Sequence, residues 1–380
     1  MKKLWVSVLL LSLLFSCFVP MNVSAAEQPF TLSCASAVLM EAESGKILYE
    51  QNSTEALPPA SVTKIMTLLL VMEAVADGRA SFTDKVTVSE RAASMGGSQV
   101  YLKVGEEMSL SDMVKSVVIA SANDAAVALA EHIYGSEEAF VEKMNARARE
   151  LSMTATHFEN TNGLDDTVQN HVTSARDIAI MSRELIKYPQ ILEYSATWMD
   201  TIRDGAFTLT NTNRLVRFYP GATGLKTGST ARAKFCISAT AERNGVSLIA
   251  VIMGAETRDE RNAQAKKLLD YGFAAYGVFR DEDRQIADLP LRGGTKDTVC
   301  LTATPFSVTL PKEQVGRVTA TVELPSYLTA PAEKGTAVGR VIYALDGSIV
   351  GEAPIIIAED VPKISFFEIL RRLLGAFSFS

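Results

Sequence analysis

Strand patterns at both ends of a long helical segment limit the fold more than any other feature of this sequence. Residues 37–49 predict a β-hairpin near the N-terminus, and residues 234–253 predict a second hairpin that turns at Asn244-Gly245. Strands need partners for their backbone hydrogen bonds, so the two hairpins are expected to share one antiparallel sheet. The helices between them would flank that sheet and form an inserted helical cluster.

The residues between the hairpins have the composition and periodicity of helices. The predicted helices cover residues 62–75, 110–134, 136–151, 174–187 and, after the second hairpin, 259–279. Beyond residue 288 the pattern changes to short strands separated by Gly, Pro and Asp. The chain is therefore expected to hold an α/β domain over residues 27–285 and a small all-β sandwich domain over residues 290–361.

The N-terminal segment has the pattern of a secretory signal peptide. Two lysines precede an apolar stretch that begins at Leu4, and the small residues Ala25 and Ala26 offer a cleavage site. A retained membrane anchor is one alternative, although the apolar stretch is shorter than the roughly 20 residues that a spanning helix needs. A lipoprotein signal around Cys17 is a weaker alternative. We expect residues 1–26 to direct secretion across the cytoplasmic membrane.

The C-terminal segment, residues 362–380, has the pattern of an amphipathic helix. Apolar residues recur at helical spacing from Phe366 onward, while Glu368, Arg371 and Arg372 lie on the opposite face. Such a helix is expected to lie on a membrane surface and to anchor the protein peripherally at the extracytoplasmic face. The alternative is an ordinary helix that packs its apolar side against a domain.

Composition and charge exclude several other classes of protein. Of the 380 residues, 47% are hydrophobic and 21% are charged, which is typical of a globular protein. The chain has 37 Lys and Arg against 44 Asp and Glu, so a nucleic-acid partner is not expected. The three histidines form no His-Glu-x-x-His motif, and the cysteine spacings match no zinc pattern. Neither a metal nor a cofactor is therefore expected.

Three short motifs occur in an order and a context that suit nucleophilic catalysis. They are Ser61-x-x-Lys64, Ser121-x-Asn123 and Lys226-Thr227-Gly228. Each motif alone is weak, because a solvated helix face or a helix cap would also explain it. The first lies at a predicted helix start and the third on a predicted edge strand. Their joint occurrence favours a shared active site.

The residue types in these motifs suit a serine nucleophile with a lysine base. Lys64 lies one helical turn from Ser61, and a serine hydroxyl becomes a nucleophile only when a base takes its proton. A lysine can be that base if burial or a neighbouring cation lowers its pKa, and Lys226 is a candidate for that cation or for binding a substrate carboxylate. Ser121 is a candidate for protonating the leaving amine. Asn123 could bond Lys64 or a substrate amide.

The predicted edge strand continues through Thr227, Gly228 and Ser229. An extended peptide could add to such an edge by main-chain hydrogen bonds, and glycine lets the two backbones approach closely. These three residues are therefore candidates for substrate binding. No Gly-x-Ser-x-Gly motif is present, which excludes the usual nucleophile elbow of α/β-hydrolases.

With these motifs the sequence resembles the serine-type D-alanyl-D-alanine carboxypeptidases, the low-molecular-mass penicillin-binding proteins of the peptidase S11 family. The resemblance extends from Ala26 to the C-terminal helix. It includes the Lys-Thr-Gly-Ser-Thr run at 226–230, Asn-Thr-Asn-Gly-Leu at 160–164 and Lys-Lys-Leu-Leu-Asp-Tyr-Gly-Phe at 266–273. Ser-Ala-Asn stands here where Ser-Gly-Asn is the commoner form, but the methyl group of Ala122 leaves both polar partners in place.

The resemblance implies a serine β-lactamase/transpeptidase-like fold and a hydrolase that removes the terminal D-alanine from peptidoglycan stem pentapeptides ending in D-Ala-D-Ala. It implies that Ser61 forms the acyl-enzyme, Lys64 is the base, Ser121 relays the proton and Lys226 binds the terminal carboxylate. It also implies that β-lactams are covalent inhibitors and that no cofactor is needed. Arg261 loosely matches a family arginine near the carboxylate pocket. A solvated residue at a helix start is the alternative for Arg261.

Two other functions remain open at this point. A β-lactamase of the same fold would need a base for fast deacylation, and no Glu-x-x-x-Asn motif of the class A type lies between Ser121 and Lys226. A penicillin-recognising sensor or a wall-binding scaffold would work without turnover. A sensor needs a transmembrane link that the sequence lacks, and a scaffold would tolerate loss of Lys64 or Ser121, although both are present.

Overall fold

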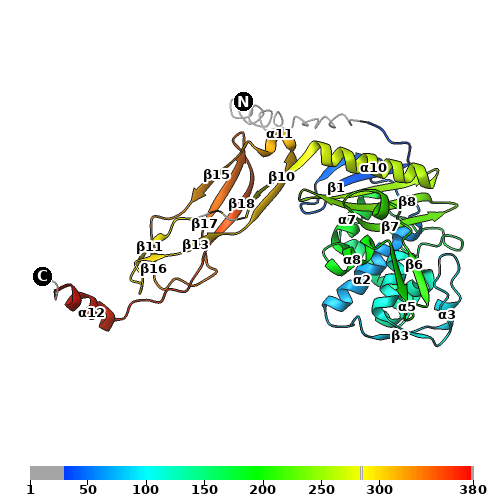
Figure 1. Ribbon diagram of the computed structural model, residues 1–380, viewed down its shortest axis with the longest axis horizontal. Helices are drawn as coiled ribbons and strands as arrows, with labels where there is room; N and C mark the ends of the chain where they lie inside the picture. Colours follow the sequence, from blue (N-terminus) through cyan, green and yellow to red (C-terminus); the bar gives the residue numbers. More distant parts are fainter. Residues whose placement is uncertain (1–29, 283, 285, 378–380) are drawn as a thin grey trace, which may run out of the picture. The chain divides into compact units, whose positions relative to one another are not determined.

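The computed structural model describes residues 30–282, 284 and 286–377 (Figure 1). The first domain is built on a five-stranded antiparallel sheet with the strand order β2-β1-β9-β8-β7. Its strands are β1 (Ser36–Glu41), β2 (Ile47–Gln51), β7 (Ala222–Thr230), β8 (Lys234–Arg243) and β9 (Val246–Ala255). Strand β1 pairs with both β2 and β9, which confirms that the two predicted hairpins share one sheet. The predicted signal peptide, residues 1–26, lies outside the described residues.

Helices cover both faces of this sheet (Figure 1). Helix α10 (Arg258–Ala275) packs on β8 and β9 from one side, and α7 (Ala175–Leu185) packs on β1 and β9 from the other. Residues 248–253 of β9 are all buried, because side chains on both faces of this strand meet a helix. The α/β class predicted from the sequence is therefore confirmed.

Helix α2 is the centre of the helical cluster. The cluster comprises α2 (Lys64–Ala76), α4 (Leu110–Ile119), α5 (Asn123–Tyr134), α6 (Glu137–Glu150) and α8 (Pro189–Ala196). Helix α2 contacts α4, α5, α6 and α7, and every residue from Lys64 to Met72 is buried. A helix surrounded in this way needs apolar residues on all faces, which explains the composition of this segment. The helix begins with a 3₁₀ turn, η1 (Ala60–Thr63).

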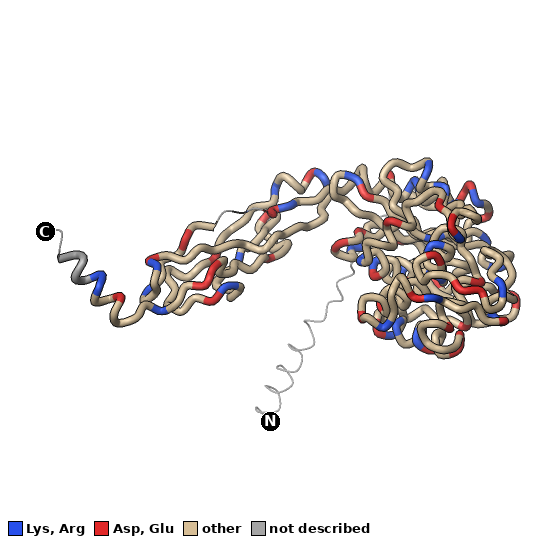
Figure 2. The backbone as a smooth tube through the Cα atoms, turned by 60° about the horizontal axis from the view of Figure 1, so that its bottom comes forward, with Lys and Arg blue, Asp and Glu red and all other residues tan. Residues whose placement is uncertain are grey.

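Shorter elements complete the first domain. They are β3 (Lys85–Thr87), α3 (Glu90–Ala93), β4 (Glu107–Ser109), β5 (Met199–Ile202), β6 (Phe207–Thr210) and α9 (Leu215–Phe218). Strand β3 pairs with β4, and β5 pairs with β6. Acidic and basic residues are interspersed along the described backbone (Figure 2), as expected for a chain whose net charge is only −7.

The single helix predicted over 110–134 is wrong, because two helices occupy this range. Helix α4 ends at Ile119 and α5 begins at Asn123. Between them, Ser121 has a φ of +62°, in the left-handed region, and a right-handed helix cannot continue through that conformation. The break places Ser121 at a turn instead of on a helix face.

The helix predicted to end at Phe279 also ends earlier, at Ala275. The following residues form β10 (Tyr276–Asp281), which pairs with β14 (Phe306–Pro311). The aromatic and branched residues of this stretch favour a strand once a partner strand is available, and the partner lies 30 residues further along the chain. Local periodicity could not reveal that partner.

The C-terminal part is a β-rich domain, as predicted. Besides the β10–β14 pair it contains a four-stranded sheet, β13-β18-β17-β15, and a three-stranded sheet, β12-β11-β16. Its remaining elements are β11 (Leu289–Arg292), β12 (Thr298–Val299), β13 (Leu301–Ala303), α11 (Lys312–Val315), β15 (Val318–Glu323), β16 (Leu328–Thr329), β17 (Ala337–Leu345) and β18 (Ser348–Ile357). Val341, Tyr343 and Ile355 are fully buried in its separate core, where Tyr343 stacks on Phe306. The boundaries 27–285 and 290–361 stay predictions.

The C-terminal helix begins later than residue 362. Helix α12 runs from Phe366 to Phe377, because Pro362 and Ile364 form backbone hydrogen bonds with residues 293–295 of the β-rich domain. Phe366 and Phe367 are 72% and 79% exposed. These two aromatic side chains are therefore exposed in the described structure, and attachment of the helix to a membrane stays a prediction.

Gly163 allows the chain to pass directly over the start of η1. Its φ is +81°, and a Cβ atom at this position would lie 1.8 Å from the carbonyl oxygen of Ala60 and 2.7 Å from Thr63 Oγ1. No side chain fits in that space. The close contact fixes the 160–164 segment against the residues that precede Ser61.

We predict that Gly163→Ala lowers the free energy of unfolding by more than about 2 kcal/mol, because a strained φ is added to a clash with backbone. Gly135→Ala is the matched control, since Gly135 has a φ of +84° but no atom within 4 Å of the added Cβ. Gly135→Ala should lower the free energy of unfolding by only about 1 kcal/mol, which is the cost of the left-handed φ alone. Urea unfolding of both variants measures the difference, and equal losses would contradict the role of the Ala60 contact.

Candidate active site

The three motifs converge on one cleft of about 400 Å³. Of the nine predicted site residues, six line it: Ser61, Ser121, Thr227, Gly228, Ser229 and Arg261. The other three, Lys64, Asn123 and Lys226, are buried and bonded to cleft residues or to one another. The cleft lies where η1, the α4–α5 turn and the edge strand β7 meet.

Lys64 is directed at Ser61. The 3₁₀ turn followed by α2 places residues three apart on one side, and Lys64 Nζ lies 2.9 Å from Ser61 Oγ. The lysine side chain is fully buried, whereas Ser61 is partly exposed to the cleft. The predicted pairing of hydroxyl and amine is therefore present in the structure.

Two further oxygens surround the Lys64 amine. Nζ donates to Asn123 Oδ1 at 2.5 Å and to the backbone carbonyl of Asn162 at 3.0 Å. The orientation of the Asn123 amide is fixed, since its nitrogen donates to the carbonyl of Gly96 at 2.7 Å. A neutral amine has two N–H groups and one lone pair. With both N–H groups engaged by carbonyl oxygens, the lone pair is left for the Ser61 hydroxyl.

Electrostatics favour this neutral form. Burial lowers the pKa of Lys64 well below 10.5, and the charge of Lys226 lowers it further, with Asp124 opposing both effects. Burial also lowers the pKa of Lys226 to about 7, helped by the charge of Arg261. The cation that the sequence predicted beside Lys64 is therefore Lys226.

Ser121 forms the second serine–lysine pair of the cleft. Lys226 Nζ donates to Ser121 Oγ at 2.8 Å and to the carbonyl of Thr227 at 2.9 Å. The left-handed backbone at Ser121 turns its hydroxyl toward β7 instead of along α5. The alternative that Ser121 and Asn123 cap the helix is wrong, because Ala122 is the N-cap and no side chain caps α5.

Strand β7 is the outermost strand of the sheet, as predicted, and its backbone lies against η1. A Cβ atom at Gly228 would lie 2.8 Å from the backbone nitrogen of Ser61 and 3.0 Å from the carbonyl of Pro59. Only glycine allows this approach. The hydroxyl of Thr227 donates to Thr212 Oγ1 at 2.8 Å, which holds the strand to the opposite wall.

Arg261 is 3% exposed and lines the cleft, so the alternative of a solvated residue is wrong. Its guanidinium donates to Asn262 Oδ1 at 2.9 Å and 3.1 Å, and burial lowers its pKa to about 10. Sequence reasoning missed two other arginines of the cleft, Arg214 and Arg258, which lie at an ordinary turn and helix start. Among the lining residues no carboxylate balances these cations.

Sequence reasoning also missed Asn162. Its contribution to the site is a backbone carbonyl, which no residue type signals. His171 has a structural role: Nδ1 accepts from the backbone N–H of Glu159 at 2.9 Å, and Nε2 lies 2.8 Å from Thr63 Oγ1. Burial lowers its pKa to about 4, so the ring is neutral at pH 7 and Nε2 carries the proton.

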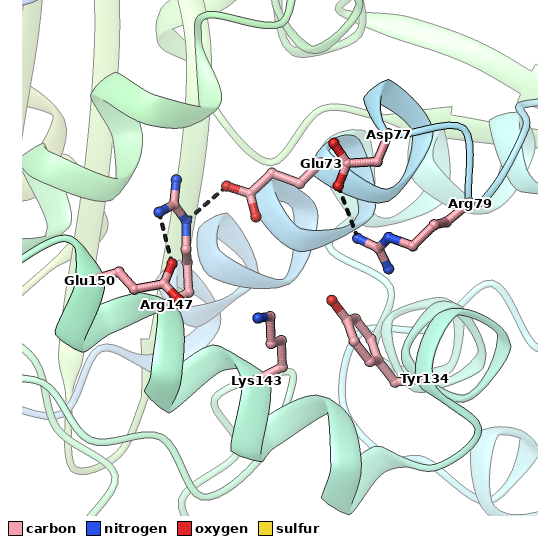
Figure 3. Close-up of a pocket in the computed structure, with 7 residues that line it drawn as sticks. All are labelled: Glu73, Asp77, Arg79, Tyr134, Lys143, Arg147 and Glu150. Carbon is pink, nitrogen blue, oxygen red and sulfur yellow. Dashed lines mark hydrogen bonds and ion pairs between the residues drawn. The ribbon is translucent and has the colours of Figure 1, made fainter.

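The described residues contain no group of His, Cys, Asp or Glu arranged as a metal site. A larger hollow of about 650 Å³ lies between α2 and α6 (Figure 3). Six charged residues and Tyr134 line it, and Arg147 bridges Glu73 and Glu150 at its edge. Its lining includes no serine, cysteine or histidine, and it shares no residue with the cleft.

Comparison with known families decides the identity. A family model described as D-alanyl-D-alanine carboxypeptidase, peptidase S11, matches residues 22–257. The chain belongs to this family. A second model, described as the C-terminal domain of penicillin-binding protein 5, matches residues 279–363. The function implied by the resemblance, a serine-type D-Ala-D-Ala carboxypeptidase, is thereby confirmed, as is the succession of a transpeptidase-like and a β-rich domain.

Individual relatives match between 64% and 99% of this carboxypeptidase. It is 42% identical to D-alanyl-D-alanine carboxypeptidase DacF of Bacillus subtilis, over 99% of this chain and 98% of that protein. Penicillin-binding protein 5 of Haemophilus influenzae is 34% identical, with a TM-score of 0.71 over 88% of this chain and 99% of that one. Penicillin-binding protein D2 of Listeria monocytogenes, solved in its ampicillin-bound form, is 33% identical, with a TM-score of 0.59 over 64% of this chain and 99% of that one.

The lowered pKa of Lys64 predicts a specific pH dependence of stability. Between the folded pKa and 10.5, only the unfolded state carries the proton, so raising the pH stabilises the fold. Relative to Lys64→Met, the wild type should therefore gain stability from pH 7 to pH 10, by up to about 1.4 kcal/mol per pH unit. Denaturant unfolding measures this, with the exposed Lys103→Met as control. A constant difference between wild type and Lys64→Met would contradict the lowered pKa.

Proposed function

We propose that this carboxypeptidase works through an acyl-enzyme on Ser61, with Lys64 as the base. The observation that carries the proposal is the environment of Lys64, whose two N–H groups meet carbonyl oxygens while Nζ lies 2.9 Å from Ser61 Oγ. Ser61 Oγ attacks the carbonyl carbon of the penultimate D-alanine, and its proton passes to Lys64 Nζ. The backbone N–H groups of Ser61 and Ser229 would stabilise the oxyanion.

Ser121 completes the first half of the reaction. When the C–N bond breaks, the leaving D-alanine nitrogen takes a proton from Ser121 Oγ, which is replaced from the lysines on either side of the cleft. The 2.8 Å bond from Lys226 to Ser121 supports this role. Water then attacks the acyl ester with Lys64 as the base, which releases the shortened peptide and restores Ser61.

The cleft suits a peptide that ends in a carboxylate. The stem peptide would add to the edge strand β7 along Thr227, Gly228 and Ser229, with its terminal carboxylate toward Lys226 and Arg261. The charged residues of the lining are all cations, which supports this orientation. Asn123 would bond a substrate amide in addition to Lys64. The ampicillin-bound state of the Listeria relative supports β-lactams as covalent inhibitors of this chain too.

We assign the enzyme to the extracytoplasmic face, held at the membrane surface by α12. The signal-peptide pattern of residues 1–26 supports export. Over the described ranges, none of the helices has the length and apolarity to cross a bilayer. The exposed aromatic rings of Phe366 and Phe367 support surface attachment instead.

Ser61→Ala is expected to abolish both D-alanine release from a pentapeptide ending in D-Ala-D-Ala and covalent labelling by penicillin, because no other hydroxyl lies against the Lys64 amine within the described residues. Freed D-alanine and the mass of the labelled protein are the two measurements. The exposed Ser81→Ala is the matched control and should keep both activities. Labelling that persists in Ser61→Ala would dismiss Ser61 as the nucleophile.

Removing residues 362–380 is expected to reduce sedimentation with liposomes of mixed neutral and anionic lipids by about tenfold or more, since the exposed aromatic residues of α12 are lost. The release of D-alanine in solution should not change. A full-length chain with Phe366→Ser and Phe367→Ser separates the effect of apolar contact from that of length. Equal binding of all three proteins would refute attachment through α12.

A further inference from the structure

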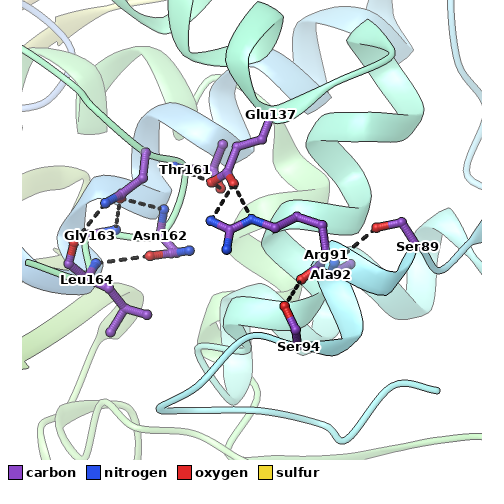
Figure 4. A network of polar contacts seen from close by, with 10 residues as sticks. Ser89, Arg91, Ala92, Ser94, Glu137, Thr161, Asn162, Gly163 and Leu164 are labelled. Carbon is purple, nitrogen blue, oxygen red and sulfur yellow. Dashed lines mark hydrogen bonds and ion pairs between the residues drawn. The ribbon is translucent and has the colours of Figure 1, made fainter. Parts of the chain in front are cut away.

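The carbonyl oxygen that holds Lys64 is itself held by a polar network behind the cleft (Figure 4). The network begins at Glu137, the first residue of α6, which is 8% exposed. One carboxylate oxygen, Oε1, accepts from Thr161 Oγ1 at 2.9 Å and from the backbone N–H of Thr161 at 3.3 Å. Thr161 directly precedes Asn162, whose carbonyl accepts from Lys64.

The second oxygen of Glu137 is also engaged. Oε2 accepts from Arg91 Nη2 at 3.0 Å and from Nε at 3.2 Å. Arg91 lies on α3, and Figure 4 shows its guanidinium directed at the Glu137 carboxylate, which in turn faces Thr161. The carboxylate also lies in the first turn of α6, where the helix dipole favours a negative charge. Both of its oxygens are therefore paired, and its place is fixed.

On its other side, Thr161 is tied to the helix that carries Lys64. The hydroxyl of Thr67, three residues after Lys64 in α2, donates to the carbonyl of Thr161 at 2.5 Å. The N–H and side chain of Thr161 thus point to Glu137, and its carbonyl points to α2. With Thr161 held from both sides, these bonds help to fix the next carbonyl in the chain, that of Asn162.

We propose that Glu137 is a positioning residue for the catalytic lysine, acting through Thr161 and the carbonyl of Asn162. This inference rests on the proposed role of Lys64 as base. Without the Glu137 carboxylate, Thr161 loses two hydrogen bonds and the Asn162 carbonyl can move away from Nζ. The amine then has one acceptor fewer and turns its lone pair from Ser61, and displacements of about 1 Å are enough to cost large factors in rate.

Neighbouring acidic residues do not share this role. Glu138 follows in the same helical turn, carries the same charge and is exposed, but it makes no bond to the 160–164 segment. Glu138→Ala therefore removes an equal charge from the same helix start and leaves the network in place. It is the matched control for Glu137→Ala.

The test measures acylation of the full-length enzyme by benzylpenicillin as a function of pH, together with kcat and KM on a D-Ala-D-Ala peptide. Glu137→Ala should acylate about tenfold more slowly, with KM within twofold of the wild type. Its acid limb should move to higher pH, because water that enters the loosened site stabilises protonated Lys64. Of the charged groups near this amine, Lys226 opposes protonation and Asp124 favours it. Glu138→Ala should match the wild type in all respects.

Arg91→Ala is a second variant for the case in which Glu137→Ala does not fold. The Arg91 side chain is 58% exposed, so its removal is expected to leave the fold intact. Arg91→Ala should show the same changes with a smaller rate loss of about threefold. If Glu137→Ala does not fold, an unshifted acid limb in Arg91→Ala overturns the inference, and a shifted one supports it. A folded Glu137→Ala with the wild-type rate and acid limb also overturns it. Either of these two contrary outcomes would leave Ser61 and Lys64 in their proposed roles, because the Ser61→Ala experiment tests those roles separately.

Discussion

The placement of one buried amine, whose pKa burial lowers well below its usual value, governs the rest of the first domain. Lys64 has no exposure to water, and the two oxygens that take its N–H groups belong to segments 59 and 98 residues away in the chain. Burying an amine without such partners costs several kcal/mol. The α4–α5 turn, the 160–164 segment and η1 must therefore pack together before Ser61 has a base.

The backbone around this amine is unusually constrained. Ala60 and Ser121 both have left-handed φ values, although neither has the conformational freedom of glycine. Ala60 directly precedes Ser61, and Ser121 itself lines the cleft. Gly163 and Gly228 in turn allow two chain segments to lie directly on η1. The site is thus built from strained or side-chain-free backbone at four points, held by a well-packed helical cluster. Strain of this kind persists only where the surroundings over-determine it.

The sequence predicted the features that depend on local spacing. The Ser61–Lys64 pair follows from one helical turn, the single sheet from the two hairpins, and the edge strand from the position of Lys226-Thr227-Gly228. The sequence-based predictions were wrong where a distant partner determines the local structure. Helix α10 stops at Ala275 because the following residues pair as β10 with β14. Pro362 does not start a helix, because it is hydrogen-bonded to residues 293–295.

The same limit applied to the site. The carbonyl of Asn162 and the network behind it involve a backbone atom and long-range contacts, neither of which leaves a mark in residue spacing. Arg261 could be named only by resemblance, since nothing in its neighbourhood distinguishes it from the exposed arginine three residues earlier.

A cleft whose charged lining residues are all positive also selects the charge at the end of the substrate. On the proposed assignment, the cations of the lining favour a substrate whose last amino acid ends in a free carboxylate. A chain that continues past this point would carry a neutral amide into a pocket of unbalanced cations. On that assignment, the charge of the lining favours a free chain end over a peptide bond within a longer chain.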